Sequence, residues 1–562
     1  MDDNFGQVVL VKDINPNNSY GYSDGSYPSN LVEFDGRLYF SANDGETGDE
    51  LWVSNGTAEG TNLVADINSN NSYGYSDGSY PDSLVEFNDR LYFGADDGET
   101  GDELWVSNGT AEGTNLVADI NSDDSSYPNE FTSLNGRLYF TADNGDGETG
   151  TELWVTNGTT EGTQLVADIN PGIETYFSQR FGETIVRPYS SNPSELTEFD
   201  GKLYFSADNN ETGRELWVTD GTTEGTQLVA NISNYSSYDY ASGSFPQDLT
   251  VFNQRLYFTV DTGGSNRELW LTDGTNEGTQ ASEVDLASFG FSPQNLTEFN
   301  GRLYFSLNDG TGEELWTTDG TNEGTQLVAD INTSSNDYYG YSSSYPSNFV
   351  EFNNKLYFSA DDGENGRELW VTDGTSEGTQ LVADINPDGY SFPSDLTVVG
   401  DELFFNANNG STGNELFKLT FDSANEPEEP INIIDGSNGK DNLVGTDDAD
   451  EIDGGNGKDT IDGDAGNDTL IGGNGQDNLV GGIGDDSLVG GRGDDLFVIQ
   501  AGQGSDTIAD FDVGKDSIGL AGGLQYEALV FEGENIFSDD ELLVTVEGVD
   551  TQQLSVDSFE VI

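Results

Sequence analysis

The chain of 562 residues carries 105 Asp and Glu against 18 Lys and Arg, which gives a formal net charge of −87 at pH 7. Nucleic acids and anionic membranes bind basic surfaces, so this charge excludes both as default partners. The chain has no Cys and no His, which excludes cysteine-protease chemistry, typical zinc sites and His-based acid–base catalysis. Aromatic residues form 11% of the sequence and recur at fixed places, so a folded protein is expected rather than a disordered acidic chain.

The first three quarters of the chain repeat one unit. Most copies contain Leu-Tyr-Phe, then Glu-Leu-Trp, then Gly-Thr-x-Leu-Val-Ala-Asp-Ile, and the Glu-Leu-Trp triplets hold all seven tryptophans. An eighth, degenerate copy reads Glu415-Leu416-Phe417. Such repetition is typical of stacked or circular architectures. The seven intact triplets begin at Glu50, Glu103, Glu152, Glu215, Glu268, Glu314 and Glu368.

Each unit predicts four short β-strands and no substantial helix. Asp35-Gly36 suits the positive φ angles of a type I′ hairpin turn between the first two strands. The strand cores are apolar on both faces, so each sheet must be covered on both sides. A closed ring of such sheets, a β-propeller, or a linear stack would satisfy this requirement. In the first unit the expected strands are about 31–34, 37–42, 50–54 and 61–67.

The two ends of the repeat array favour the ring. The last copy lacks a fourth strand, and the missing sequence stands at the other end of the array, in residues 6–15. We therefore predict an all-β fold with an eight-bladed β-propeller over about 6–421, closed by an N-terminal strand. The strands expected in the last copy are about 395–399, 402–407 and 414–419.

These units resemble the Glu-Leu-Trp-Val-x-Asp-Gly-Thr repeats of large bacterial extracellular proteins that are often called hyalin-like. The resemblance covers about three quarters of the chain and implies an architecture without a defined reaction. The links between blades are Tyr-rich, as in 18–27, and the links between the second and third strands are acidic and Gly-rich, as in 43–48. Aromatic, amide and carboxylate groups on one face suit carbohydrate, and clustered carboxylates suit Ca²⁺. The alternative is that these loops are simply solvated.

One insertion interrupts the repeat pattern between residues 170 and 193. It contains two arginines and several aromatic residues, whereas most other basic residues of the propeller stand at one repeated strand position. Arginine beside tyrosine can hold an anionic sugar or a carboxylate. The alternative is a loop that packs over its own blade. The candidate ligand-binding residues are Tyr176, Arg180, Arg187 and Tyr189.

A second repeat system follows a Pro-containing linker, and the domains are expected to be a propeller at 1–424, a linker at 425–435, a roll at 436–498 and a cap at 499–562. The roll consists of seven uninterrupted nine-residue repeats of the form Gly-Gly-x-Gly-x-Asp-x-Φ-x, where Φ is apolar. Position six is always aspartate, in Asp441, Asp450, Asp459, Asp468, Asp477, Asp486 and Asp495.

This spacing predicts calcium sites in the turns of the roll. Glycines expose carbonyl oxygens in backbone conformations that are closed to other residues, and the aspartate adds a carboxylate, so the donors are the hard oxygens that Ca²⁺ prefers. The apolar residue points inward from a short strand. That thin apolar column cannot offset chain entropy and carboxylate repulsion, so metal binding must supply much of the folding free energy. The expected donors beside the aspartates are turn carbonyls near Gly439, Gly457, Gly466, Gly475, Gly484 and Gly493.

The nonapeptides closely resemble the RTX (repeats-in-toxin, hemolysin-type) family. The resemblance implies a parallel β-roll in which each Ca²⁺ lies between one turn and the turn two repeats on, so about five ions are expected. Thr446, Asp448 and Asp464 stand where glycine is usual. The resemblance further implies a C-terminal β cap and, in residues 556–562, an uncleaved type I secretion signal. An ordinary edge strand is the alternative for this tail.

These features lead to a functional hypothesis. The start of the chain is acidic and predicts no cleavable signal peptide, which favours type I secretion. We expect a bacterial extracellular protein, secreted or attached to the cell surface, that binds calcium and has a structural, adhesive or glycan-binding propeller. Its partners would be calcium, an extracellular polysaccharide or a cell-surface protein, and the type I secretion machinery.

Two other classes of function were weighed. A secreted polysaccharide-acting enzyme remains the alternative, because glycosidase carboxylates need no His. We expect no catalytic residues, since the acidic loops are copies of one another rather than a set of unlike residues. A pore-forming toxin is disfavoured, because no apolar or amphipathic helical segment is available for membrane insertion.

Overall fold

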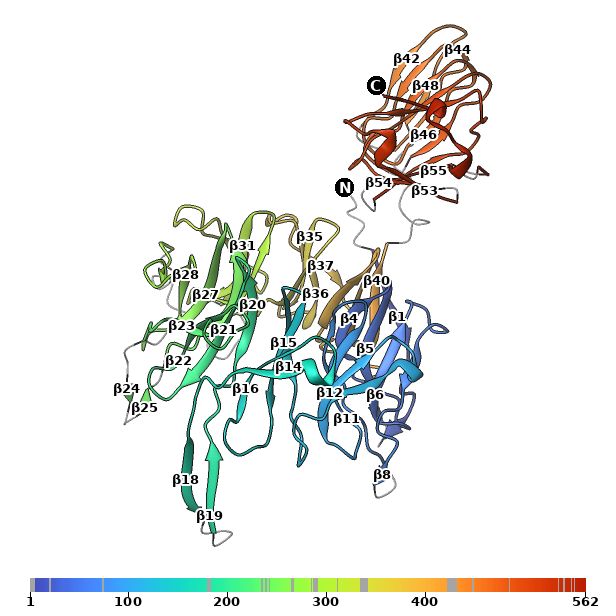
Figure 1. Ribbon diagram of the computed structural model, residues 1–562. Coiled ribbons are helices and arrows are strands. Elements are labelled where there is room, and N and C mark those ends of the chain that lie inside the picture. The colour runs from blue at the N-terminus through green and yellow to red at the C-terminus, as the bar shows by residue number, and fades with distance from the viewer. Residues whose placement is uncertain are drawn as a thin grey trace. The chain divides into compact units, whose positions relative to one another are not determined.

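The computed structural model divides the chain into two compact units, Met1–Asp422 and Ser423–Ile562. Strands dominate both units (Figure 1), and the helices in the described residues are short 3₁₀ turns. No helix in this described part has the length and apolar character needed to cross a bilayer. The structure describes residues 6–561 except 20–21, 73–74, 179–182, 234–235, 238–239, 242, 264–266, 285, 287–291, 311, 334–341, 422–431, 447–448, 485, 534, 539–540, 547 and 550.

The first unit contains eight four-stranded antiparallel sheets within its described residues, and we number these sheets as blades 1 to 8. Blades 1 to 4 are β4 (Ser29–Phe34), β5 (Arg37–Asn43), β6 (Asp49–Ser54) and β7 (Asn62–Ala65); β10 (Asp82–Glu86), β11 (Leu91–Asp96), β12 (Asp102–Ser107) and β13 (Asn115–Ala118); β14 (Asn129–Leu134), β15 (Arg137–Asp143), β16 (Thr151–Thr156) and β17 (Gln164–Ala167); β20 (Ser194–Phe199), β21 (Lys202–Asn209), β22 (Gly213–Thr219) and β23 (Gln227–Ala230).

The second half of the ring has the same strand order. Blades 5 to 8 are β26 (Gln247–Phe252), β27 (Arg255–Asp261), β28 (Arg267–Thr272) and β29 (Gln280–Ala281); β30 (Gln294–Phe299), β31 (Arg302–Asn308), β32 (Glu313–Thr318) and β33 (Gln326–Ala329); β34 (Ser347–Phe352), β35 (Lys355–Asp361), β36 (Arg367–Thr372) and β37 (Gln380–Ala383); β38 (Ser394–Val399), β39 (Glu402–Asn408), β40 (Asn414–Thr420) and β1 (Gln7–Lys12).

Short elements decorate the connections between these strands. The insertion in the link between blades 3 and 4 forms a hairpin that projects from the blades in Figure 1. The connecting elements are β2 (Asn18–Ser19), β3 (Tyr22–Ser23), β8 (Asn71–Ser72), β9 (Tyr75–Ser76), η1 (Ala111–Gly113), η2 (Thr160–Gly162), β18 (Ile173–Ser178), β19 (Glu183–Pro188), β24 (Ser236–Ser237) and β25 (Tyr240–Ala241).

The blades form a closed ring. The first strands of neighbouring blades contact each other all the way round, and β38 of the last blade contacts β4 of the first. The last blade is completed by β1, which runs antiparallel to β40 with Gln7 opposite Thr420 and Leu10 opposite Phe417. The predicted eight-bladed propeller with an N-terminal closing strand is therefore confirmed, and the linear stack is excluded.

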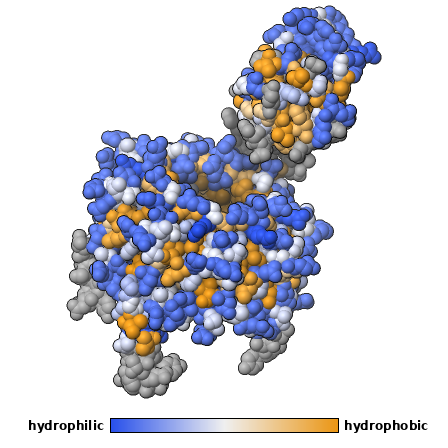
Figure 2. All heavy atoms as spheres, viewed as in Figure 1, coloured by the Kyte–Doolittle hydropathy of each residue, from blue (hydrophilic) through white to orange (hydrophobic). Residues whose placement is uncertain are grey.

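Packing between blades explains why the strand cores are apolar on both faces. Leu38 and Phe40 of β5 have no exposed surface, and they pack with Trp52 of their own blade and with Phe404 and Leu416 of blade 8. Each sheet thus buries one face against each neighbour, as the sequence pattern predicts. Hydrophilic residues cover most of the visible surface of this unit in Figure 2, which agrees with the large negative charge of the chain.

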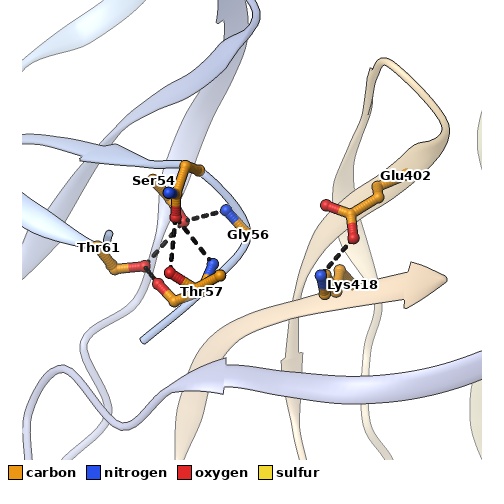
Figure 3. A network of polar contacts seen from close by, with 7 residues as sticks. Ser54, Gly56, Thr57, Thr61, Glu402 and Lys418 are labelled. Carbon is orange, nitrogen blue, oxygen red and sulfur yellow. Dashed lines mark hydrogen bonds and ion pairs between the residues drawn. The ribbon is translucent and has the colours of Figure 1, made fainter. Parts of the chain in front are cut away.

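The turns follow the predicted chemistry. Asp35 and Gly36 have φ angles of 50° and 67°, as a type I′ turn requires. The turn after β6 is held by a 2.8 Å hydrogen bond between the hydroxyls of Ser54 and Thr61, and the ion pair of Glu402 with Lys418 in blade 8 lies opposite it (Figure 3). Equivalent hydroxyl pairs at 2.7–2.8 Å join Ser107–Thr114, Thr156–Thr163, Thr219–Thr226, Thr272–Thr279, Thr318–Thr325 and Thr372–Thr379.

The second unit is a parallel β-roll with a C-terminal cap. Successive repeats alternate between two sheets of the described chain, with strand orders β41-β43-β46-β49-β51-β55-β54-β53 and β42-β45-β48-β50-β52-β56. The bounds are β41 (Asn432–Asp435), β42 (Asn442–Val444), β43 (Asp450–Asp453), β44 (Asn456–Gly457), β45 (Thr460–Asp462), β46 (Thr469–Ile471), β47 (Asn474–Gly475), β48 (Asn478–Val480), β49 (Ser487–Val489), β50 (Leu496–Ile499), β51 (Asp506–Ile508), β52 (Ser517–Leu520), η4 (Tyr526–Ala528), β53 (Leu529–Glu532), β54 (Asn535–Ser538), β55 (Glu541–Val546), η5 (Thr551–Gln553), η6 (Val556–Ser558) and β56 (Phe559–Val561).

A narrow apolar column runs between the two sheets of the roll. The apolar residue of each repeat points into it, and six of the seven have no exposed surface: Ile452, Ile461, Leu470, Leu479, Leu488 and Phe497. The cap adds a wider core at one end, where residues such as Ile508, Ile518 and Val544 pack onto the column. Within the repeats, each turn therefore buries little more than one apolar side chain, as predicted.

Candidate calcium site and propeller face

The repeat aspartates of the roll form a continuous hydrogen-bonded ladder. The main-chain N–H of Asp459 donates to Oδ1 of Asp477 at 2.7 Å, and the N–H of Asp477 donates to Oδ1 of Asp495 at 2.8 Å. Each bond joins one repeat to the repeat two places on. The same bond at 2.7–2.8 Å joins Asp441 to Asp459, Asp450 to Asp468 and Asp468 to Asp486.

In four of these aspartates the second carboxylate oxygen has no hydrogen-bond donor among the described residues. Oδ2 of Asp459, Asp468, Asp477 and Asp495 is buried and accepts no hydrogen bond from any described residue. Their side chains are only 1–2% exposed, so water cannot freely solvate them. An unpaired buried carboxylate oxygen is costly unless a cation neutralises it.

Main-chain carbonyl oxygens of the turns lie close to the same carboxylates. A β-carbon on Gly472 would lie 2.7 Å from the carbonyl oxygen of Gly490 and 2.9 Å from Oδ2 of Asp477. At the predicted turn positions, a β-carbon on Gly475 would collide with the carbonyl oxygen of Gly457 and lie 3.1 Å from Oδ1 of Asp477. Glycine is therefore required there, and carbonyl and carboxylate oxygens from turns two repeats apart face each other. These hard donors fit Ca²⁺.

Electrostatics in the roll favour a bound cation. Burial, together with the neighbouring carboxylates of Asp486 and Asp450, raises the pKa of Asp468 to about 6. Burial also raises the pKa of Asp495 to about 6, with Asp516 and the other nearby aspartates acting in the same direction. No group of three His, Cys, Asp or Glu side chains suited to a metal occurs in the described residues. Any metal held here must therefore take main-chain oxygens as well as carboxylates.

The first two repeats differ from the later ones. Oδ2 of Asp441 accepts hydrogen bonds from the N–H and hydroxyl of Ser437, and Oδ2 of Asp450 accepts equivalent bonds from Thr446. In these two repeats Oδ2 thus has a donor from the protein, whereas Oδ2 of Asp459, Asp468, Asp477 and Asp495 has none among the described residues. Asp448 lies outside the described residues. Asp464, where glycine is usual, takes the left-handed conformation of a glycine, with φ of 73°.

The ladder extends into the cap beyond the nonapeptides. The N–H of Asp486 donates to Oδ1 of Asp506 at 3.3 Å, and the N–H of Asp495 donates to Oδ1 of Asp516 at 2.9 Å. The carboxylate of Asp510 accepts the N–H groups of two further turn glycines. Sequence reasoning missed these residues because the nine-residue spacing is lost. The signal was the triplet Asp-x-apolar, which recurs at 506–508 and 516–518.

On the propeller, the glutamate of each Glu-Leu-Trp triplet holds the link to the next blade. Oε2 of Glu50 accepts the hydroxyl of Ser79 at 2.5 Å and the N–H of Ile67 at 2.9 Å, and Oε1 accepts the N–H of Ser79. These bonds end the fourth strand at Ala65, short of the predicted residue 67. Burial raises the pKa of Glu50 to about 7 despite these bonds. The equivalent buried glutamates are Glu103, Glu152, Glu215, Glu314, Glu368 and Glu415.

Among the described residues, blade 5 shows no such latch. Its glutamate, Glu268, is only partly buried and accepts hydrogen bonds from Thr262 and from the indole of Trp270. Sequence reasoning missed the latch because the partner serine lies 23–39 residues further along the chain in the copies within the ring. The signal was a serine that precedes an aromatic residue and a proline at the start of most blades.

The insertion predicted as a binding loop is a β-hairpin. Tyr176 stands opposite Ile185 on it, and Arg187 is exposed and stands opposite Glu174. Tyr189 is half-buried at the base of the hairpin, where its ring lies 3.2 Å from the position of a β-carbon on Gly172. Arg180 and the side chain of Tyr176 lie outside the description. The four residues therefore share a hairpin, and their role in binding stays a prediction.

Comparison with protein families identifies the repeats of the second unit. Residues 435–470, 463–497 and 471–508 match the RTX calcium-binding nonapeptide repeat. The segment 435–508 is therefore an array of RTX repeats, which bind calcium generally, and the chain as a whole has the features of a calcium-binding protein. No curated protein matches the sequence.

The chain is similar to several solved hydrolases and peptidases at low sequence identity. A puromycin hydrolase is 10% identical with a TM-score of 0.39, over 77% of this chain and 65% of that one. The β-propeller domain of the Trilobed protease from Pyrococcus furiosus is 11% identical with a TM-score of 0.37, over 64% of this chain and 97% of that one. The acylaminoacyl peptidase of Pyrococcus horikoshii is 11% identical with a TM-score of 0.37, over 75% and 61%. The chain thus spans less than two thirds of two of these proteins.

Proposed function

We propose that the chain is a secreted, non-enzymatic calcium-binding protein whose roll folds on external Ca²⁺ and whose propeller holds an extracellular polysaccharide or surface ligand. The observation that carries the proposal is the ladder of buried aspartates, in which Oδ2 of Asp459, Asp468, Asp477 and Asp495 accepts no hydrogen bond from a described residue. Ca²⁺ would supply the missing partner and neutralise the repulsion between the carboxylates.

The proposed ligands are the repeat aspartates with the turn carbonyls of repeats two places away. Oδ2 of Asp459, Asp468, Asp477 and Asp495 accepts no hydrogen bond from a described residue, whereas Ser437 and Thr446 donate to Oδ2 of Asp441 and Asp450 in the first two repeats. The apolar column gives the repeats little burial, so binding free energy becomes folding free energy. About five ions are expected from pairs of turns two repeats apart.

Calcium-dependent folding offers a reason for secretion in an unfolded state. Cytosolic calcium is scarce, so the roll would remain unfolded until it reaches the extracellular side, where modules bind in the 10⁻⁴–10⁻³ M range, on the order of external calcium. Residues 559–561 form an edge strand, β56, beside β52 in the folded roll. A type I secretion signal in this tail would be an unpaired segment before folding and would pair with β52 afterwards.

The propeller supports a binding role better than a catalytic one. Buried carboxylates with a raised pKa often mark catalytic sites. Here the same glutamate recurs in seven of the eight described blades with the same serine and main-chain partners, as in Glu50 with Ser79. That repetition favours a structural role. A polysaccharide-acting enzyme would need unlike carboxylates facing one another.

Hydrogen exchange of the full chain tests the proposal. The amides of 436–518 should be protected in about 1 mM Ca²⁺ and exchange rapidly after excess EGTA, because the roll then lacks its cations. Amides of the blade strands should keep their protection in both conditions. Equal protection of 436–518 with and without Ca²⁺ would contradict the proposal.

A further inference from the structure

Six aromatic residues stand at equivalent, strained positions where the links enter the blades. Each precedes a proline and lies just before a first strand, and each is 42–64% exposed despite its size. Their φ angles fall between 47° and 51°, in the left-handed region. These residues, which we call the aromatic crown, are Tyr27, Tyr80, Tyr127, Phe245, Tyr345 and Phe392.

Folding alone does not explain the crown. A residue with a β-carbon in the left-handed region costs roughly 1–2 kcal/mol, and bulky residues there are outliers. Blade 4 has Asn192 at the same position with φ of 43°, so a residue that tolerates this conformation can take the place. Much of each aromatic residue also stays exposed to solvent. Strain that recurs at aromatic residues left so exposed points to a function for them.

The main chain around each crown residue is held rigidly. The N–H of Tyr345 donates to the carbonyl oxygen of Glu313 at 3.2 Å, and the preceding Ser344 donates its hydroxyl to the buried Glu314 at 2.6 Å. The carbonyl oxygen of Tyr345 accepts hydrogen bonds from the guanidinium of Arg367. The exposed ring is therefore presented on a fixed backbone, and binding would order few groups.

Two crown residues line cavities that are formed by equivalent loops of two blades. A cavity of about 550 Å³ lies over blade 7, with Tyr345 and Tyr390 in its wall together with Asp361 and Glu364. Tyr390 is 51% exposed, and its ring stacks on that of Phe392 with centroids 5.3 Å apart. The equivalent cavity at blade 2, about 520 Å³, is lined by Tyr80, Asp96 and Asn68 among others. These volumes are typical of small-molecule sites.

We propose that these cavities are saccharide subsites for neutral, hydroxyl-rich sugar rings, an assignment that rests on the polysaccharide-binding role proposed for the propeller. Apolar faces of a sugar ring would stack on Tyr345 and Tyr390, and its hydroxyls would donate to carboxylate and amide oxygens of the wall. The described lining of the larger cavity contains Asp361, Glu364 and Asp388 and no Lys or Arg. Anionic sugars would therefore be repelled. Two equivalent cavities on one ring suit a polymer through avidity.

A printed array of neutral and anionic oligosaccharides tests the assignment with the full chain in Ca²⁺. The variant Tyr345→Asn with Tyr390→Ala should weaken binding of the neutral saccharides about tenfold, as expected when anchoring aromatic residues are lost. Asn is chosen because Asn192 occupies the equivalent position in blade 4. The matched control Val251→Asn removes an exposed apolar side chain from β26, away from both cavities and from the hairpin, and it should bind as the unchanged chain does. Tryptophan fluorescence verifies that every variant is folded.

Three results would overturn the assignment. Neutral saccharides that bind the double variant as tightly as the unchanged chain would place the site elsewhere on the molecule, while the proposed polysaccharide-binding role would stand. Binding confined to anionic saccharides would overturn the neutral class. Binding to no saccharide at all would overturn both the subsites and the polysaccharide part of the proposed function.

Discussion

At the scale of single residues, buried carboxylates stabilise both units in opposite ways. The latch glutamates of the propeller have their oxygens satisfied by serine and main-chain donors, as Glu152 has by Ser191 and Ile169. Four described aspartates of the roll have an oxygen without such a donor, as Asp477 has. Burial raises the pKa of both kinds of residue. The propeller therefore satisfies its buried carboxylates with its own hydrogen-bond donors, whereas the roll requires an external cation.

The latch predicts a contrast between two glutamates. Glu152→Ala should lower the free energy of unfolding of the propeller by about 2–4 kcal/mol, because it leaves a buried hydroxyl and buried N–H groups without an acceptor. Glu268→Ala, in the blade without the latch, should cost less than about 1 kcal/mol. Urea unfolding followed by tryptophan fluorescence measures both. Equal losses would show that the latch contributes nothing beyond ordinary packing.

The ladder predicts a contrast between two aspartates. Asp477→Ala removes an acceptor for Asp459 and an unsatisfied oxygen in the middle of the stack, so the Ca²⁺ midpoint of folding should rise about tenfold and the transition should broaden. Asp441→Ala should shift the midpoint less, because Ser437 already satisfies Oδ2 of Asp441. Calcium titration followed by hydrogen exchange over 436–518 measures both. The order of effects would be reversed if the first turn nucleated the roll.

Sequence reasoning reached some of these residues and not others. The position of each repeat aspartate follows from a nine-residue period, because every turn of the roll repeats the same geometry. The cap aspartates, Asp506 and Asp516, escaped this reasoning because the chain between turns is longer there. The crown positions also escaped it, since a φ angle near 48° is not expected of a tyrosine. The nine-residue period reveals the geometry that the repeats share, whereas backbone strain can be recognised only in the three-dimensional structure.

At the scale of elements, one strand determines whether the propeller is a ring. β1 pairs with β40 along most of its length, and Val11 of this strand and Ile14 just beyond it are buried against blades 1 and 8. The N–H of Ile14 donates to the latch glutamate Glu415 at 3.0 Å. This one strand therefore completes a sheet, a hydrophobic cluster and a latch.

Deletion of residues 1–15 tests this role. It should lower the stability of the propeller by about 3–6 kcal/mol, because several apolar side chains lose their burial and β40 becomes an open edge. Deletion of residues 1–5 alone, ahead of β1, is the matched control and should change stability little. Urea unfolding and sedimentation would report lost stability and edge-to-edge association. Unchanged stability of the longer deletion would mean that the ring does not depend on its closing strand.

Most strands could be predicted from the sequence to within a few residues. Each blade repeats the same apolar strands and turn residues, so the strand bounds of one copy agree with those of the other copies. The insertion between blades 3 and 4 has no other copy for comparison, and its hairpin of β18 and β19 was expected as a loop. The fourth strands end early because the latch glutamates take the N–H groups of residues such as Ile67.

At the scale of the whole molecule, stability of the propeller should depend on pH in an unusual direction. Burial raises the pKa of Glu50, Glu152, Glu314, Glu368 and Glu415 to about 7 from an ordinary value of 4.5. Between these two values the folded state binds more protons than the unfolded state, so the free energy of unfolding rises as pH falls from about 7 to about 4.5.

The thermal midpoint of the propeller should therefore be several degrees higher at about pH 5.5 than at about pH 7.5. Tryptophan fluorescence reports this unit alone, because all seven tryptophans lie in its blades. Glu152→Gln, which removes one titrating latch, should show a smaller difference between the two pH values. A midpoint that falls on acidification would mean that the latch glutamates remain ionised with little energetic penalty.

The pairing of β1 with β40 also has a mechanical consequence. Gln7 stands opposite Thr420, so the two ends of the propeller leave the ring from the same end of one antiparallel pair. Tension between these ends would load the hydrogen bonds between β1 and β40 one after another, so the two strands would separate sequentially from that end. In the other blades, consecutive strands are joined by short turns and would not be pulled apart until this seam had opened. A tethered copy under tension would therefore yield first at the junction of its two ends.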